Sequence, residues 1–322
     1  MTDQIPCYTR LVLTVASFAL NLSCRFDLLR RLLLRLDPKS PPSSTQGVTS
    51  FDVTVDPSRN LWFRLYHPSP SPSPSPSTLP LLLYFHGGGF VFGSPCSTTF
   101  DSLCRRLAHD LQAVVVSVNY RLAPHHRYPC QYDDGLDALK FIDTQNYAVL
   151  PSCTDLNRCF IAGDSAGGNI AHHVTLRACD HVFEKVKIIG VVAIQPFFGG
   201  EERTESELRL VGAPIINTRH TDWMWRSFLP EGSTRDHEAA NVSGDVRAVR
   251  FPATVVLVGG LDPLQDWQRR YCEGLRKSGK EVELVEYPDA IHGFCTFPGL
   301  PQLGHAIATL KEFIIKQSAA SK

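Results

Sequence analysis

The chain has 322 residues, of which 43% are hydrophobic and 20% are charged, and its 32 basic side chains balance its 32 acidic ones. This composition is typical of a globular protein with one large domain and an appended segment. The zero net charge argues against a nucleic-acid partner and against attraction to an anionic membrane. The 10 cysteines form no CxxC pair or Cys/His cluster, so neither a metal site nor a redox motif is expected.

The N-terminal segment carries helical patterns. An apolar run over 11–20 imitates a signal peptide, but no small-residue cleavage site follows it. The run is too short to span a bilayer, and an amphipathic helical pattern continues over 25–36 until Pro38. We expect residues 1–45 to form a helical cap, or lid, whose leucines rest on the main domain. A helix lying on a membrane surface is the alternative.

Strand patterns begin near residue 50. The alternating segments Phe51–Asp56 and Asn60–His67 indicate an antiparallel hairpin. A Ser-Pro repeat over 68–76 lacks regular backbone donors, so we expect an elongated surface loop rather than a ligand for a protein module. Six short, continuous apolar runs follow, as expected of strands that are buried on both faces: Leu81–Phe85, Ala113–Val118, Cys159–Ala162, Ile188–Ile194, Thr254–Val258 and Val282–Tyr287.

Helical segments alternate with these apolar runs. Together with the hairpin, the alternation predicts an α/β fold: an eight-stranded, mostly parallel sheet with helices on both faces, spanning 46–322. The pattern breaks at about 200–250, which we interpret as a cap insertion that roofs the site together with the N-terminal helices. The clearest helical segments are Phe100–Leu111, Gln131–Thr144, Gly168–Ala178 and Asp266–Ser278.

The strongest chemical signal is a G-x-S-x-G motif at 163–167, with Ser165 at its centre. A predicted strand precedes the motif and a predicted helix follows it, which is the context that a nucleophile elbow requires. Ser165 would stand at the carboxyl end of a strand and at a helix N-terminus, where backbone N–H groups favour negative charge. An ordinary turn serine is the alternative, and this context argues against it.

A second motif, His86–Phe90, contains three successive glycines and directly follows a predicted strand. Without Cβ atoms, backbone N–H groups can approach a ligand closely. The loop suits the second half of an oxyanion hole, whose first half would be the N–H of Ala166. Alone, the three glycines would indicate only a flexible loop, but two matched motifs in the right order are far more specific.

A base and an orienting acid must follow the nucleophile in the order acid, then histidine. Asp262 and His292 each lie just past a predicted strand, at the same carboxyl edge of the sheet as Ser165. His292 would take the serine proton and return it to the leaving group, while Asp262 would hold the imidazole tautomer.

Other residues compete for these roles. Asp266 lies one helical turn beyond the predicted acid, where a surface or capping role is expected, and Asp289 lies in the loop of the predicted base. His305 is expected on the last helix, remote from the site. The remaining histidines show no metal spacing.

With these motifs, the chain resembles the plant carboxylesterases of the hormone-sensitive-lipase subfamily, which are relatives of the gibberellin receptor. The resemblance implies an α/β-hydrolase fold, a mobile N-terminal lid, and oxyanion donors at Gly88, Gly89 and Ala166. One departure is His125, where the family has glutamate before the following histidine. The matching stretches are His86–Phe90, Tyr120–Pro124, Gly163–Asn169, Gln195–Gly200 and Asp262–Trp267.

The resemblance also separates two functions. The receptor branch has lost the triad histidine and binds its hormone without hydrolysis, whereas this sequence keeps His292. We therefore expect a carboxylesterase that hydrolyses a small, fairly apolar ester through an acyl-serine intermediate, without a cofactor. The alternatives are a specialised-metabolism enzyme that performs elimination, cyclisation or acyl transfer, and a receptor-like hormone-binding protein. A chain of this size does not need disulfides, so we expect it in the cytoplasm, with the nucleus as a further compartment.

Overall fold

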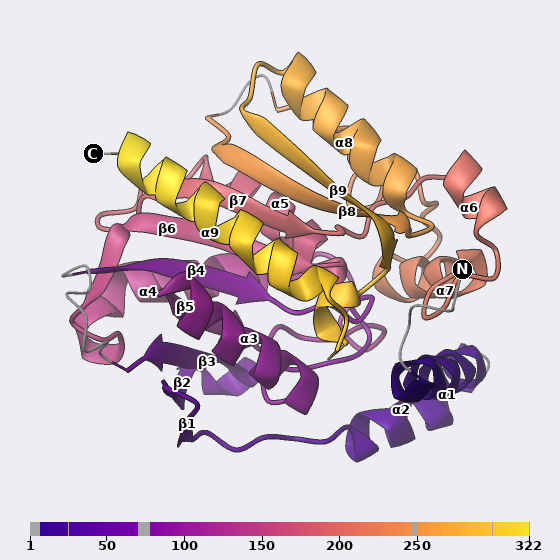
Figure 1. The fold of residues 1–322 in the computed structure, drawn as a ribbon, viewed down its shortest axis with the longest axis horizontal. Coiled ribbons are helices and arrows are strands. Elements are labelled where there is room, and N and C mark those ends of the chain that lie inside the picture. The colour runs from indigo at the N-terminus through magenta and orange to yellow at the C-terminus, as the bar shows by residue number, and fades with distance from the viewer. Residues whose placement is uncertain (1–6, 25, 70–77, 247–249, 298, 322) are drawn as a thin grey trace.

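The computed structural model describes residues 7–24, 26–69, 78–246, 250–297 and 299–321. Their core is one nine-stranded sheet in the order β1-β2-β3-β5-β4-β6-β7-β8-β9, flanked by helices (Figure 1). The strands are β1 Ser44–Thr45, β2 Val48–Asp56, β3 Leu61–Pro68, β4 Leu79–Phe85, β5 Val114–Val118, β6 Thr154–Asp164, β7 Ile188–Ile194, β8 Ala253–Leu261 and β9 Val282–Ile291.

The helices alternate with the parallel strands, as the sequence pattern predicts. The α-helices are α1 Cys7–Ser23, α2 Asp27–Leu36, α3 Thr98–Leu111, α4 Cys130–Val149, α5 Ala166–Ala178, α6 Glu205–Arg209, α7 Thr218–Phe228, α8 Gln265–Lys277 and α9 Gln302–Ala320. Two short 3-10 turns, η1 Pro57–Arg59 and η2 Phe294–Thr296, complete the described elements. The predicted class, a mostly parallel sheet with helices on both faces, is confirmed.

The sheet has an antiparallel edge and a parallel body. β1, β2, β3 and β5 pair antiparallel in succession, and the pairs from β5 through β4, β6, β7 and β8 to β9 are all parallel. The predicted count of eight strands was wrong, because the sheet also contains the two-residue strand β1. Ser44 and Thr45 lie in a polar, proline-rich stretch without an alternating pattern. They pair with β2 because the two-residue turn Gln46–Gly47, with φ +52° and +70°, reverses the chain.

Two hydrophobic cores cover the two faces of this sheet. Helices α4, α5 and α8 contribute to one core, and α3 and α9, which contact each other, contribute to the other. All five residues of β5 are buried. Burial on both faces explains why the parallel strands are continuous apolar runs rather than alternating ones.

The N-terminal segment forms two helices, α1 and α2, at the end of the molecule where the parallel strands terminate, close to α7 (Figure 1). The helical pattern extends over both, and the break between them lies near Cys24 and Phe26. No helix in the described ranges is both long and apolar enough to cross a membrane. The expectation for the Ser-Pro repeat stays a prediction, because 70–77 lies outside the described residues.

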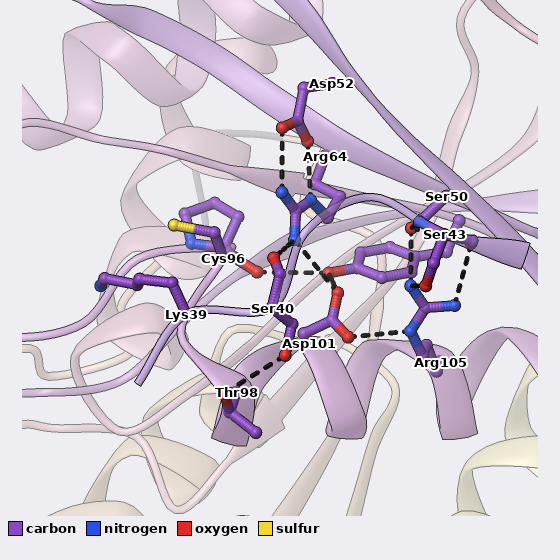
Figure 2. A network of polar contacts seen from close by, with 12 residues as sticks. Lys39, Ser40, Ser43, Ser50, Asp52, Arg64, Cys96, Thr98, Asp101 and Arg105 are labelled. Atoms are coloured by element: carbon purple, nitrogen blue, oxygen red, sulfur yellow. Dashed lines mark hydrogen bonds and ion pairs between the residues drawn. The ribbon is translucent and has the colours of Figure 1, made fainter. Parts of the chain in front are cut away.

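A network around two buried arginines fastens the segment that leads from α2 into the sheet (Figure 2). Arg64 donates to the carbonyl oxygen of Ser40 at 2.6 Å and to Asp101 at 3.2 Å. Arg105 bonds the other oxygen of Asp101 at 2.8 Å and the hydroxyl of Ser43 at 2.9 Å. The segment between α2 and β1 is therefore fastened to the main body by buried side chains of β3 and α3.

Candidate active site

Ser165 occupies a sharp turn between β6 and α5, with φ 53° and ψ −118°. A non-glycine residue with such angles is strained and persists only where the surroundings impose it. A Cβ on Gly163 would lie 2.2 Å from the carbonyl carbon of Gly167, and a Cβ on Gly167 would lie 1.9 Å from the carbonyl oxygen of Phe85. The two glycines of the motif therefore permit the close approach of strands and helix that forms the turn.

The structure brings the three predicted triad residues together. Ser165 Oγ lies 2.8 Å from Nε2 of His292, and Nδ1 of His292 lies 2.8 Å from Oδ2 of Asp262. The three residues are 8%, 3% and 0% exposed. Ser165 follows β6, Asp262 follows β8 and His292 follows β9, so the carboxyl edge of the parallel sheet positions all of them.

The Asp262 carboxylate accepts several further hydrogen bonds. Its Oδ1 accepts the backbone N–H of Leu264 at 2.8 Å, and its Oδ2 accepts the side-chain amides of Gln268 at 3.0 Å and Gln195 at 3.2 Å. These donors replace the hydration that a carboxyl group loses when it is buried. No motif in the sequence marks either glutamine as part of the site, because Gln195 follows β7 and Gln268 lies on α8, and only the fold brings both to Asp262.

The glycine loop lies beside the nucleophile. Gly88 and Gly89 have φ +106° and +60° and line the same cavity as Ser165. A Cβ on Gly88 would lie 2.4 Å from the carbonyl oxygen of Phe92, and a Cβ on Gly89 would lie 2.2 Å from Sδ of Met224. Within the described contacts, the N–H groups of Gly88, Gly89 and Ala166 donate to no protein acceptor. They remain available to a ligand.

Asp164 ties this loop to the nucleophile turn. Its Oδ1 accepts the O–H of Tyr84 and, at 2.8 Å, the backbone N–H of Gly87. Burial raises the pKa of the Asp164 carboxyl to about 6, against the lowering effect of these two donors. One carboxyl group thus connects the residue before the nucleophile with the start of the glycine loop, and no local motif in the sequence marks this contact.

His86 begins the glycine loop and is fully buried. Its ring stacks on Tyr120, whose hydroxyl donates to the His86 carbonyl at 2.7 Å. Burial lowers the pKa of the His86 imidazole to about 4, so this ring is neutral near pH 7 and packs as an aromatic residue.

A cavity of about 470 Å³ opens above the triad. Ser165 and His292 lie in its wall, together with the two glycines of the glycine loop and apolar side chains from the segment after that loop, the insertion and the C-terminal part. The lid supplies a large share of the remaining wall, all of it apolar apart from the end of α2: Ala16, Ala19, Leu20, Leu33, Leu34, Leu36 and Asp37.

The lid contacts the insertion through polar groups as well. Ser17 Oγ lies 2.9 Å from the backbone nitrogen of Ile215, and the Asn21 side chain lies 2.9 Å from Nε2 of His220. Nδ1 of His220 lies 2.9 Å from the carbonyl oxygen of Ile215. Ile215 has φ +70°, a strained conformation for a β-branched residue, and it also lines the cavity.

The competing residues lie elsewhere. Asp266 accepts the backbone N–H of Ser206 at 2.8 Å, which holds the insertion, and Asp289 and His305 are exposed. Trp225, on α7 of the insertion, is buried and stacks on Phe197 with ring centroids 4.5 Å apart, and it does not line the cavity. Over the part of the chain that the structure describes, no group of three His, Cys, Asp or Glu residues is arranged to hold a metal ion.

Comparison with known proteins gives the chain two kinds of relative. A family model described as the α/β-hydrolase fold matches residues 82–296. A gibberellin receptor of Arabidopsis thaliana is 42% identical over 313 residues, which cover 91% of this chain and 90% of the receptor. Carboxylesterase 20 of the same plant is 40% identical over 258 residues, which cover 76% of this chain and 78% of that protein.

Solved structures with a similar fold include esterases. An esterase from Pyrobaculum calidifontis superposes with a TM-score of 0.74 at 30% identity, covering 94% of each chain. The resemblance predicted from the motifs is thereby confirmed, and the relatives include both enzymes and receptors.

Proposed function

This chain belongs to the α/β-hydrolase family, in its hormone-sensitive-lipase-like branch, and on that premise we propose that it is a serine carboxylesterase. The observation that carries the proposal is the unbroken hydrogen-bonded chain Ser165–His292–Asp262, whose serine faces an apolar cavity. Ser165 is the nucleophile, His292 the general base and acid, and Asp262 the group that holds the imidazole.

In the first half-reaction, Ser165 Oγ attacks the ester carbonyl carbon while Nε2 of His292 takes its proton. The N–H groups of Gly88, Gly89 and Ala166 stabilise the oxyanion that develops on the carbonyl oxygen. Each such donor contributes roughly 3 kcal/mol to lowering the barrier. Imidazolium then protonates the alkoxide leaving group, the C–O bond breaks, and an acyl-serine remains.

In the second half-reaction, water takes the place of the alcohol. His292 removes a proton from the water, whose oxygen attacks the acyl carbon through the same oxyanion geometry. The tetrahedral intermediate collapses, the proton returns to Ser165 Oγ, and the carboxylic acid leaves. Asp262 accepts the Nδ1–H of His292 and stabilises the imidazolium that forms in both halves.

The cavity supports a small, fairly apolar ester as the substrate. Its volume of about 470 Å³ falls in the range of ordinary small-molecule sites. Its walls are mainly leucine, alanine, isoleucine, phenylalanine and methionine side chains, and such walls bind acyl chains and rings by burying apolar surface.

The test is the release of p-nitrophenol from short-chain esters by the wild type and by Ser165→Ala. We expect turnover by the wild type and a loss of at least about 1000-fold in the variant. Equal rates for a folded variant and the wild type would overturn the assignment of the nucleophile.

A second candidate is a receptor-like protein that binds a small apolar ligand without turnover. The 42% identity with a gibberellin receptor over nearly the whole chain favours it, as does the lid that covers the cavity. Absence of turnover by folded wild type over several acyl lengths, with tight binding of an apolar ligand, would move the conclusion to this candidate.

A further inference from the structure

Gln195 follows β7 directly and is 1% exposed. Its φ of +44° is a left-handed conformation that costs a non-glycine residue about 1 kcal/mol or more. The backbone holds it there, because its N–H donates to the carbonyl of Leu257 on β8 at 2.8 Å. The strained conformation directs one buried amide side chain between the loops that follow β8 and β9.

That amide makes three hydrogen bonds to the triad and its immediate neighbours. Nε2 donates to Asp262 Oδ2 at 3.2 Å and to the carbonyl oxygen of Ile291 at 3.1 Å, and Oε1 accepts the backbone N–H of Gly293 at 2.8 Å. The reverse orientation of the amide would set an oxygen against two acceptors and a nitrogen against a donor. The surrounding groups therefore fix the amide orientation.

Ile291 and Gly293 flank His292 in the chain. The Gln195 side chain therefore hydrogen-bonds the backbone on both sides of the histidine and, at the same time, the carboxylate of the triad acid. The space for it is tight, because a Cβ on Gly259 would lie 2.5 Å from its Nε2. Gln195 is not among the residues that line the cavity. It therefore acts on the triad from behind and not on the substrate.

We propose that Gln195 is a positioning residue that sets both the orientation of the His292 imidazole and the charge that Asp262 presents to it. The inference rests on the proposed hydrolase function. With Gln195 removed, the histidine loop loses both of its amide contacts, and the reacting atoms depart from their alignment. The carboxylate also loses one donor, so more of its negative charge faces the imidazolium.

Gln268 offers a matched control. Its Nε2 donates to the same Oδ2 of Asp262 at 3.0 Å and to the carbonyl oxygen of Pro196 at 3.3 Å, and among the described residues its side chain makes no hydrogen bond to the histidine loop. Removing Gln268 takes away a donor without loosening His292. The two glutamines therefore separate the effect on charge from the effect on geometry.

The experiment measures kcat and KM from pH 5 to 9 for wild type, Gln195→Met and Gln268→Met, together with thermal unfolding. We expect Gln195→Met to lower kcat by about 100-fold, with KM within about twofold of the wild type. Gln268→Met should lower kcat by less than about tenfold. In both variants the acid limb of kcat/KM should move to higher pH by about 0.5, because the carboxylate supports the protonated imidazole more strongly.

A third variant, Gln195→Glu, is nearly isosteric and keeps an acceptor for Gly293. Its ionised carboxylate would face Asp262, so its activity relative to the wild type should rise as the pH falls and the new carboxyl can donate. A merely structural role would lower the unfolding temperature without these pH effects. The proposal is overturned if folded Gln195→Met keeps the wild-type kcat and acid limb, or if it matches Gln268→Met in every parameter.

The downfield N–H proton resonance of His292, followed by NMR against pH, gives a readout that does not require turnover. In Gln195→Met we expect this resonance to broaden and its titration midpoint to rise. If the wild type shows no turnover but the resonance changes in Gln195→Met as expected, the esterase function is rejected and the positioning role is kept. If the wild type turns over esters but the resonance does not change in Gln195→Met, the esterase function is kept and the positioning role is rejected.

Discussion

The carboxyl edge of the sheet and the N-terminal lid both line one cavity, and they are built differently. At the sheet edge, Asp262 is fully buried, and its carboxylate accepts four hydrogen bonds from backbone and side-chain groups of the described residues. The lid contributes mainly apolar side chains to the cavity, while Val15 and Phe18 on its outer face are 59% and 66% exposed.

The difference indicates that the sheet edge positions the catalytic atoms, whereas the lid contributes apolar surface for binding. Catalysis needs atoms held within a fraction of an ångström, which a dense hydrogen-bond network on rigid strands provides. Binding of an apolar group needs complementary surface, which tolerates adjustment of packed side chains. Changes at the sheet edge should therefore alter kcat, and changes in the lid should alter which esters are bound.

The largest effects are expected from the triad itself. His292→Ala should lower kcat by roughly 10⁴-fold or more, and Asp262→Asn by about 10⁴-fold, because the latter favours the wrong imidazole tautomer. Stopped assays with p-nitrophenyl acetate measure both. A loss of less than tenfold in a folded His292→Ala protein would contradict the assigned base.

The next effect is expected at the glycine loop. In Gly89→Ala, the new Cβ would meet Met224 and would require φ +60° of an alanine, so the loop must shift. We expect kcat to fall by about 100-fold, with a smaller change in KM. Gly212→Ala is the control, because a Cβ there meets nothing within 4 Å. Equal behaviour of the two variants would exclude the loop from transition-state stabilisation.

The sequence predicts those parts of the site that local motifs or chain order mark. It does not predict contacts between residues that are far apart in the chain. Ser165 and the glycine loop are recognised from local motifs, since a nucleophile turn and a close backbone approach need glycines at fixed positions. Asp262 and His292 are found from chain order, because each follows a buried apolar run. Their positions directly after predicted parallel strands place Asp262 and His292 at the carboxyl edge of the sheet, even without knowledge of their contacts.

Gln195 and Asp164 show where such reasoning stops. Gln195 acts through a left-handed backbone and contacts on two loops that lie about 67 and 96 residues away in the chain, and neither has a local signal. The residues of the cavity wall could not be predicted from local patterns either, because α1 and α2 reach the cavity only through tertiary packing. Polar β1 was missed for the same reason: pairing, not an apolar pattern, makes it a strand.

A smaller effect is expected from the lid, and it should concern selectivity. Ala19→Trp would fill part of the cavity, so KM for octanoate esters should rise about tenfold while acetate esters keep a kcat within about threefold. Val15→Trp, on the exposed face of the same helix, is the control and should change neither. Kinetics over a series of acyl lengths measures this. Parallel losses for all esters would argue against a lid that selects the substrate.

The smallest effect on turnover is expected at Asp164, where stability changes instead. Its folded pKa of about 6 lies above the unfolded value near 3.8, so the native state binds more protons between these pH values. Stability from this group is therefore present at low pH and is lost as the pH rises through about 6. Asp164→Asn should add about 2 to 3 kcal/mol to the free energy of unfolding at pH 8 and little at pH 4.

Denaturant unfolding at the two pH values tests this prediction. Asn can still accept from Tyr84 and Gly87 at the same position, so kcat at pH 8 should stay within a few fold of the wild type. A variant that is less stable at pH 8 than at pH 4, relative to wild type, would contradict the assigned direction of the pKa.

The most direct test of the central claim is the intact mass of the protein after reaction with an alkyl fluorophosphonate, followed by peptide mapping. We predict one adduct, carried by Ser165, that is absent from Ser165→Ala and strongly slowed in His292→Ala, while Gly212→Ala reacts as the wild type does. No adduct on folded wild type, or an adduct on another residue, would contradict the account of Ser165 as a nucleophile activated by His292.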